Sequence, residues 1–381
     1  MTKREILIDY VKNGGQRFLC SPQIGAGAGF DTKIAEKTWI GDTTIEDTRN
    51  AWEMFDVIPL YNYELPQLHE LTPKLEMKKV SGPGKTADRR LTHKKLITAL
   101  GSLTSEIIED EGKGALAVKY FITEEEELEI FEYYLDCLLE VKDFSPITEG
   151  VRHIRKIVGE DSALDLQWPM QPYELLCFPN TVDTAVFALT CPDIFKRLMD
   201  KILELDERLL LAVSKGGADF VFLGGPGSEL ISPQYYRDYL VPYSKIVTEM
   251  AHKNGLLVYT HICSRIEPML SLGFYNEMGI DLFETLSEEP VGNVKSIEDA
   301  FEKLDPKICT RGNIGLDKLL LGTPQEIKEI SFRILETAKR LGRKHILAAS
   351  DYMFYDTPVE NVRAMAEAAA EFNGCPLNDL V

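Results

Sequence analysis

The second half of the chain alternates short apolar runs with longer segments in which apolar residues recur every three or four positions. Short runs rich in β-branched and aromatic residues predict buried strands, and the longer amphipathic segments predict helices. Five strands are predicted on this basis, at residues 218–225, 256–263, 280–286, 308–314 and 345–351. Because a helical segment separates each strand from the next, we expect a parallel sheet that is buried on both faces.

Residues at the ends of the predicted helices agree with this assignment. Two helices begin at Ser-Pro or Thr-Pro pairs, Ser232-Pro233 and Thr323-Pro324, where the first residue caps and proline fits the first turn. Several helices stop at glycines, which are residues 255, 273 and 342. With a comparable length of chain still upstream, the fold class predicted is α/β, a (β/α)8 TIM barrel.

The first half of the chain is less regular. Residues 17–24 predict the first barrel strand, and residues 182–216 predict paired helices. Residues 87–122 are polar and alternating, and they predict a hairpin insertion followed by a strand. The sequence shows no internal repeat and no low-complexity linker, so we predict one domain over residues 1–381, a barrel with an N-terminal extension and a hairpin insertion.

Composition narrows the class of protein. The 381 residues are 44% hydrophobic and 27% charged, which is typical of a globular protein. A formal net charge of −19 argues against binding to nucleic acid or to an anionic membrane. The start of the chain has no secretory signal pattern, and seven cysteines without disulfide spacing indicate reduced thiols, so we expect a cytoplasmic protein.

The run "VYTHICS" carries the first candidate chemistry, a histidine and a cysteine two residues apart. Side chains alternate along a strand, so His261 and Cys263 are expected on the same face. Imidazole nitrogen and thiolate sulfur are both good zinc ligands. The alternative is a core histidine bonded to a backbone carbonyl beside a small buried cysteine.

Further polar residues fall where other predicted strands end. Glu284 lies near the end of the next strand, Asn313 follows another, and Asp351 ends the last. Because the chemistry of such barrels sits at the carboxyl ends of the strands, we expect these residues to lie near His261 and Cys263. Two alternatives stay open: Glu284 could pair with an arginine, and Asp351 could cap the turn that follows it.

Residues 217–372 resemble the uroporphyrinogen decarboxylase superfamily. The runs that carry the resemblance are "GADFVFLGGPGSELISPQYYRDYLVPYSKIV", "GLLVYTHIC", "MGIDLFETL", "CTRGNIGLDKLLLGTPQEIKE" and "HILAASDYMFYDTPVENVRAM". The resemblance implies one of two chemistries on a barrel. One branch removes acetate carboxyls from a porphyrinogen without a cofactor, and the other comprises zinc-dependent methyltransferases linked to a corrinoid.

Departures from the decarboxylase pattern favour the methyltransferase branch. The segment that matches the arginine-rich stretch of the decarboxylases reads "GQRFLCSPQIGAGAGF" and holds only Arg17, too few cations for a polycarboxylate. The H-x-C pair of the methyltransferases is present as His261 and Cys263. The last-strand residue, histidine in decarboxylases and cysteine in methyltransferases, is here Asp351. We therefore predict zinc on His261, Cys263 and Asp351, with Glu284 or water as the fourth ligand.

The function expected from the resemblance is methyl transfer between a corrinoid protein and a small thiol or methylated donor such as an ether, with zinc as Lewis acid. The chain has no D-x-H-x-x-G cobalamin motif, so the cobalamin must come from a partner. His261, Cys263 and Asp351 are the predicted catalytic residues, and Gly225, Asn313 and Tyr352 are the predicted substrate contacts. Trp168 is a second candidate wall, for which we favour a place in the core.

Two other functions stay open on the sequence. One is a metal-free decarboxylase of a carboxylated porphyrinogen or a smaller acid. The other is a barrel that only binds or regulates, in which Asp351 marks a lost site. The frequent dimers of the superfamily suggest a homodimer, although the sequence leaves the oligomeric state open.

Overall fold

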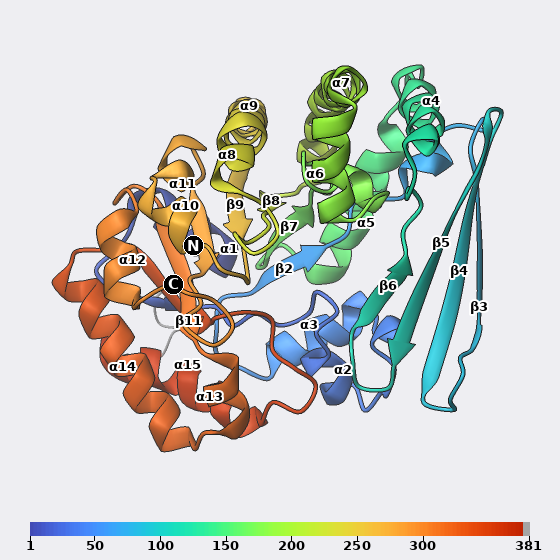
Figure 1. Cartoon of the computed structure of the whole chain (residues 1–381). Coiled ribbons are helices and arrows are strands. Elements are labelled where there is room, and N and C mark those ends of the chain that lie inside the picture. The colour runs from blue at the N-terminus through green and yellow to red at the C-terminus, as the bar shows by residue number, and fades with distance from the viewer. Residues whose placement is uncertain (376–381) are drawn as a thin grey trace.

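A computed structural model describes residues 1–375, and its centre is a curled eight-stranded parallel sheet (Figure 1). The strands follow the spatial order β1-β12-β11-β10-β9-β8-β7-β2. Their bounds are β1 Leu19–Cys20, β2 Leu60–Tyr63, β7 Ala163–Gln167, β8 Phe220–Gly224, β9 Leu257–His261, β10 Leu282–Thr285, β11 Cys309–Ile314 and β12 His345–Ala349. Beside β1 and β2, the amide of Ile58 donates to the carbonyl of Cys20 at 2.9 Å and links the two ends of the sheet. The predicted barrel class and its five later strands are confirmed.

Burial on both faces explains why the later strands read as continuous apolar runs. Every residue of β9, β10, β11 and β12 is buried. Inside the sheet, a small core joins Leu60, Phe220, Leu257 and Leu282 to apolar residues of helix α1 (Lys3–Asn13). This helix packs at the amino ends of the strands, so the barrel is closed there and its chemistry is left to the opposite end.

Helices form the outer layer of the barrel. The longer ones are α4 Leu128–Leu139, α5 Ser145–Val158, α6 Thr181–Thr190, α7 Pro192–Gly216, α9 Val241–Lys253, α14 Pro324–Arg340 and α15 Val359–Asn373. The shorter ones are α2 Phe30–Ile34, α3 Ile45–Glu53, α8 Pro233–Tyr235, α10 Glu267–Ser271, α11 Phe274–Glu277, α12 Ile297–Lys303 and α13 Leu316–Leu321. Helices α6 and α7 are the predicted pair over residues 182–216. Among the described residues, none of the helices has the length and apolar character that crossing a membrane requires.

A second sheet of four antiparallel strands stands apart from the barrel, and we call it the flap. Its strands are β3 Glu76–Pro83, β4 Arg89–Thr98, β5 Gly101–Asp110 and β6 Ala115–Lys119, paired in that order. The predicted hairpin at 87–122 was therefore wrong in extent: the insertion starts at residue 76 and has four strands. Strand β3 was missed because it reads "EMKKVSGP" and has no buried residue, hence no apolar alternation.

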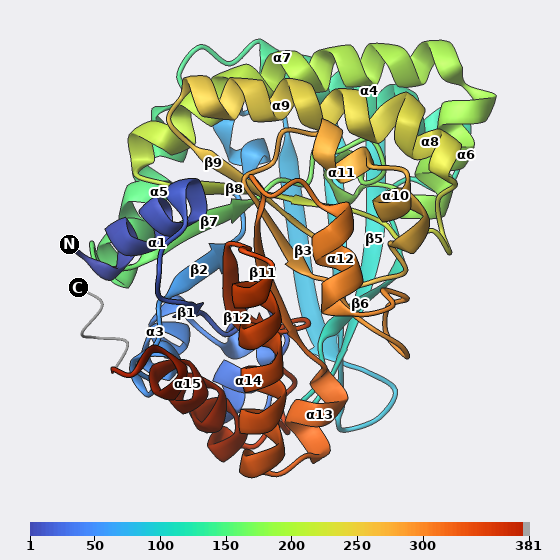
Figure 2. The same ribbon diagram turned by 90° about the vertical axis from the view of Figure 1, so that its left-hand side faces the viewer.

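Both views place the flap on the side of the molecule toward which the barrel strands point. In Figure 1 the arrow of β2 points toward the flap, which lies to one side of the barrel. In Figure 2 the flap lies behind the barrel. The flap therefore faces the mouth of the barrel, where the carboxyl ends of the strands lie.

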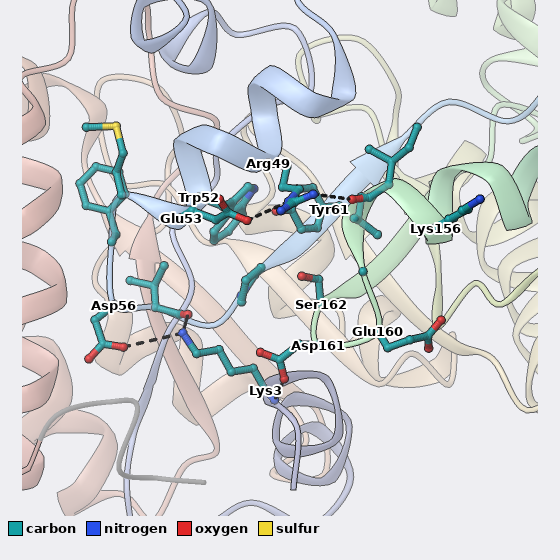
Figure 3. Close-up of a pocket in the computed structure, with 17 residues that line it drawn as sticks. Lys3, Arg49, Trp52, Glu53, Asp56, Tyr61, Lys156, Glu160, Asp161 and Ser162 are labelled. Carbon is teal, nitrogen blue, oxygen red and sulfur yellow. Dashed lines mark hydrogen bonds and ion pairs between the residues drawn. The ribbon is translucent and has the colours of Figure 1, made fainter.

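A cavity of about 600 Å³ lies at the other end of the barrel, beside α3 and α5 (Figure 3). Its wall includes the segments that precede β2 and β7, and its charges are largely internal pairs. Lys3 Nζ lies 3.7 Å from Asp56 Oδ1, and Arg49 Nε lies 2.8 Å from Glu53 Oε1. None of the predicted site residues lines this cavity, and the amino end of a barrel serves stability rather than chemistry. We therefore place the candidate site at the opposite end.

Candidate functional site

His261 is the last residue of β9, and its side chain is buried at the mouth of the barrel. The strand ends there, so Cys263 lies in the loop that follows and is exposed. The expectation that Cys263 shares a strand face with His261 was therefore wrong. The loop nevertheless returns the thiol to the imidazole, and Asp351, just after β12, completes a group of three whose ligand atoms lie within 4.8 Å of one another.

The imidazole of His261 is held by a carboxylate at each nitrogen. Nδ1 lies 2.6 Å from Oε1 of Glu284 on β10, and Nε2 lies 3.2 Å from Oδ1 of Asp351. Glu284 therefore lies behind the ring, away from the group formed with Cys263. The side chain predicted as a fourth metal ligand is instead occupied with the orientation of His261.

Arg311 on β11 fixes Glu284 in turn. Its Nη1 donates to Glu284 Oε2 at 2.7 Å, while Nε and Nη2 donate to the carbonyls of Ser21 and Pro22 at 2.8 and 2.9 Å. Arg311 and Glu284 face each other directly in the register of β10 and β11, and both are buried. Sequence reasoning missed Arg311, although a lone arginine within the otherwise apolar or small run "CTRGNI" was the available signal.

These contacts determine the protonation of the pair. Burial opposes charge on His261, but its hydrogen bonds to Asp351, Cys263 and Glu284 outweigh this effect and hold the pKa of His261 well above its usual value. Burial also raises the pKa of a carboxyl, but the positive charge of Arg311 and the bond from His261 keep the pKa of Glu284 below its usual range. Glu284 is therefore ionised and accepts a hydrogen bond from Nδ1.

The donor set suits a divalent metal. Nε2 of His261, Sγ of Cys263 and a carboxylate oxygen of Asp351 are all ligand types that zinc accepts. Ligand atoms around a tetrahedral zinc lie about 3.3–3.8 Å apart, so separations of no more than 4.8 Å leave at most about 1–1.5 Å of closure to be made by side-chain rotation. The three residues therefore fit the ion in both ligand type and spacing.

Aromatic rings flank the imidazole. The rings of Tyr352 and Phe222 have their centroids 5.5 and 5.6 Å from that of His261. Tyr352, predicted as a substrate contact, thus lies in the site. Trp168 is fully buried and donates from Nε1 to Asp206 at 2.8 Å, which confirms its preferred place in the core.

The two other predicted substrate contacts are engaged with the protein itself. Asn313 is buried and donates from Nδ2 to the carbonyl of Leu286 at 3.1 Å. Gly225 follows β8, and a Cβ there would lie 2.6 Å from Ile262 and 2.7 Å from the hydroxyl of Tyr236. The absence of a side chain at Gly225 therefore serves close packing against these two neighbours.

A second polar cluster crosses the other half of the barrel, and sequence reasoning missed it. Asp165 on β7 is fully buried and accepts from Asn62 at 2.5 Å and from the hydroxyl of Tyr259 at 3.0 Å. Gln167 donates to the carbonyl oxygen of the Asn62 side chain at 2.7 Å. Because burial holds the pKa of Asp165 well above its usual value, this cluster adds polarity to the floor of the mouth with little negative charge.

In (β/α)8 barrels, catalytic and binding residues lie at the carboxyl ends of the strands. The polar cluster around His261 lies at that end of this barrel. The chain belongs to the uroporphyrinogen decarboxylase family, whose model matches residues 176–372. It is 26% identical to the uroporphyrinogen decarboxylase of Coxiella burnetii over 230 residues, which are 55% of this chain and 60% of the relative. The corresponding protein of Trichodesmium erythraeum is 27% identical over 240 residues, 60% of this chain and 63% of that one. The chain therefore matches less than two thirds of the length of these two relatives.

The fold extends this likeness over the whole chain. A methyltransferase from Methanosarcina mazei superposes with a TM-score of 0.66, covering 98% of this chain and 99% of that one, at 17% sequence identity. At this identity the likeness establishes the fold. The reaction has to be argued from the site.

Proposed function

We propose that this protein transfers a methyl group between a corrinoid carried by a partner protein and a small thiol or methylated donor such as an ether, with zinc held by His261, Cys263 and Asp351. One observation carries the proposal: three zinc-ligand types converge within 4.8 Å at the mouth of the barrel. The likeness of the fold to a methyltransferase agrees with it.

Each residue of the cluster has a role in this proposal. Glu284 accepts from Nδ1 of His261 and so keeps Nε2 available as the ligand atom. Arg311 keeps Glu284 ionised and in place. Tyr352 and Phe222 lie beside the imidazole and limit the access of water to it. We therefore assign Glu284 to orientation and not to ligation.

The ligand set also favours methyl transfer from an ether over methyl transfer to a thiol. A zinc ion bound by one thiolate would supply stronger Lewis acidity than one bound by two, which suits an ether oxygen better than a thiol. In that direction the methyl–oxygen bond of the donor would break, the methyl group would pass to the reduced cobalt of the partner's corrinoid, and the alcohol oxygen would keep the electron pair.

The experiment combines metal content with methyl transfer. Purified protein should bind about one zinc per chain, and with a panel of methylated ethers it should methylate free cob(I)alamin. His261→Ala should lose both the metal and the transfer. Protein without affinity for zinc, or a His261→Ala variant as active as the wild type, would remove the proposal.

One finding favours a second function. The relatives from Coxiella burnetii and Trichodesmium erythraeum are uroporphyrinogen decarboxylases, so a metal-free decarboxylation is the alternative. Against it, Arg17 is the only arginine in the segment that matches their arginine-rich stretch, and the buried Arg311 is already paired with Glu284. Carbon dioxide release from a porphyrinogen, undiminished by chelation of metal, would establish the alternative.

A further inference from the structure

The flap differs in charge from the rest of the molecule. Residues 76–119 hold nine lysines and arginines and six acidic residues, a net +3, whereas the whole chain carries −19. A basic module on an acidic protein attracts a partner whose surface carries the opposite charge. Such a partner would therefore bind on the face of the flap that carries unneutralised positive side chains.

One face of β4 is turned toward the barrel. Leu96 is buried in the main core, and helix α4 packs on β4 and β5. Six residues earlier on the same face, Arg90 donates to both oxygens of Asp42 at 2.7 and 3.0 Å and stacks over Trp39 at 4.0 Å. Between these two anchors, side-chain alternation places Thr92 and Lys94 on the same face. We call this the inner face.

Like charges meet on this inner face. Lys94 lies directly opposite Lys79 of β3 in the register of the flap. Directly opposed like charges on neighbouring strands destabilise a sheet. Within the described part of the chain, no ion pair neutralises either lysine, although many other flap charges are paired. The fold thus keeps two adjacent unneutralised ammonium groups at some cost in stability.

The inner face lies at the rim of the barrel mouth. Lys94 interacts electrostatically with His69, which follows β2, and with the thiol of Cys177, which follows β7. Figures 1 and 2 both show the flap beyond the carboxyl ends of the barrel strands. A molecule that contacts this face therefore also lies at the mouth that contains His261.

We propose that the inner face of the flap, centred on Lys79 and Lys94, docks an acidic surface of the protein that brings the methyl carrier to the barrel. This inference rests on the proposed function for the identity of the partner. A strand of ten residues extends about 33 Å, so the flap is much longer than a small substrate and matches the width of a protein surface. The hydroxyls of Ser81 and Thr92, 2.8 Å apart on the same face, can serve as additional hydrogen-bond donors.

The structure offers a matched control on the same two strands. Lys78 and Lys95 also oppose each other directly, but alternation places them on the outer face of the flap. A variant with Lys79→Gln and Lys94→Gln is compared with one carrying Lys78→Gln and Lys95→Gln. The probe is a fluorescein-labelled polyglutamate peptide, and its binding is measured by fluorescence anisotropy at increasing ionic strength.

Neutralising the inner pair should weaken binding of the peptide by about tenfold at low salt and flatten its salt dependence, whereas the outer pair should change it by no more than about twofold. The thermal unfolding midpoint of the inner variant should not fall, because a repulsive pair is removed. Equal losses in both variants, no binding of the peptide, or tighter binding of a single-stranded oligonucleotide would each overturn the inference.

Methyl transfer to free cobalamin separates this inference from the proposed function. Free cobalamin needs no docking surface, so the inner variant should methylate it at the wild-type rate. If methyl transfer is absent while the inner face alone binds the peptide, the proposed function fails and the basic docking face stands. If transfer is present while peptide binding ignores the inner pair, the docking inference fails alone.

Discussion

Oε1 of Glu284 lies 2.6 Å from Nδ1 of His261, so the imidazole presents its other nitrogen to the mouth of the barrel. Glu284 is fully buried, and its second oxygen is held by Arg311. The geometry of the ring is therefore determined before any ligand binds. Such carboxylate partners of metal-binding histidines set both tautomer and orientation.

Glu284→Gln tests this relationship. The amide keeps the size of the side chain but removes the charge that stabilises the Nδ1–H tautomer. Zinc affinity should fall by about 10–100-fold, measured by competition with a chelating dye. Glu288→Gln, an exposed change in the loop that follows, is the control. Wild-type affinity in Glu284→Gln would show that the ring needs no such support.

Arg311→Met tests the buried ion pair behind the site. It leaves the carboxylate of Glu284 buried without its cation, and losing one partner of such a pair costs about 3–5 kcal/mol. Urea unfolding at neutral pH should show this loss. Adding Glu284→Gln to the same chain should restore part of it, because no charge is then left unpaired. A double variant less stable than Arg311→Met would contradict this account.

Substitutions of Asp351 test whether it is the third zinc ligand, as proposed. Asp351→Cys should tighten zinc binding, because thiolate is a softer ligand than carboxylate, and Asp351→Ala should weaken it. Absorption of cobalt-substituted protein reports the change directly, since a second sulfur ligand intensifies the thiolate-to-metal band. Identical spectra for wild type and Asp351→Cys would place residue 351 outside the metal sphere.

The strands that carry the site were predictable because they are buried on both faces. Each of β8 to β12 reads as a short apolar run between glycine or proline signals, and the structure forms all five. Their carboxyl ends share one rim of the barrel, so the grouping of His261 with Asp351 could be expected from the fold class alone. The flap was misjudged because its strands lie mostly exposed, where apolar alternation is weak.

The contacts within the site were less accessible to sequence reasoning. Glu284 and Arg311 are 27 residues apart, and only the register of β10 with β11 places them opposite each other. The position of Cys263 depended on where β9 ends, and pattern alone did not fix that residue. Local sequence therefore indicates which residues reach the rim, while the pairing between them follows from strand register.

His345 provides a pH test that is separate from the candidate metal site. It is fully buried on β12, with Nε2 2.9 Å from the carbonyl of Gly312, and burial lowers the pKa of His345 to about 3. An unfolded histidine titrates near about 6.5, so below that pH the unfolded chain takes up a proton that the folded chain refuses. Its contribution to the free energy of unfolding therefore falls by up to about 1.4 kcal/mol per pH unit as the pH drops from about 6.5 toward 3.

His345→Gln should remove this dependence. In urea unfolding between neutral and mildly acidic pH, the stability of the variant relative to the wild type should increase as the pH falls. The exposed His153→Gln serves as the control and should run parallel to the wild type. A constant difference between His345→Gln and the wild type across this range would mean that His345 is protonated in the folded protein.

Asp206 should affect the pH dependence of the free energy of unfolding in the opposite direction. Fully buried on α7, it accepts from Trp168 at 2.8 Å and from the hydroxyl of Tyr243 at 2.9 Å, and burial raises its pKa to about 7. An unfolded aspartate ionises near about 3.9, so between that pH and about 7 the folded chain holds the extra proton, and the contribution to stability falls as the pH rises. Asp206→Asn keeps one acceptor oxygen for Trp168, and its amide nitrogen can donate to the hydroxyl oxygen of Tyr243 in place of the bond that the carboxylate accepts. Relative to the wild type, the stability of this variant should increase as the pH rises through this window. Between about pH 4 and 6.5, His345 and Asp206 have opposite effects on the pH dependence of stability. Plots of the difference in free energy of unfolding between each variant and the wild type should therefore have slopes of opposite sign in this range. Slopes of the same sign would refute at least one of the two assignments.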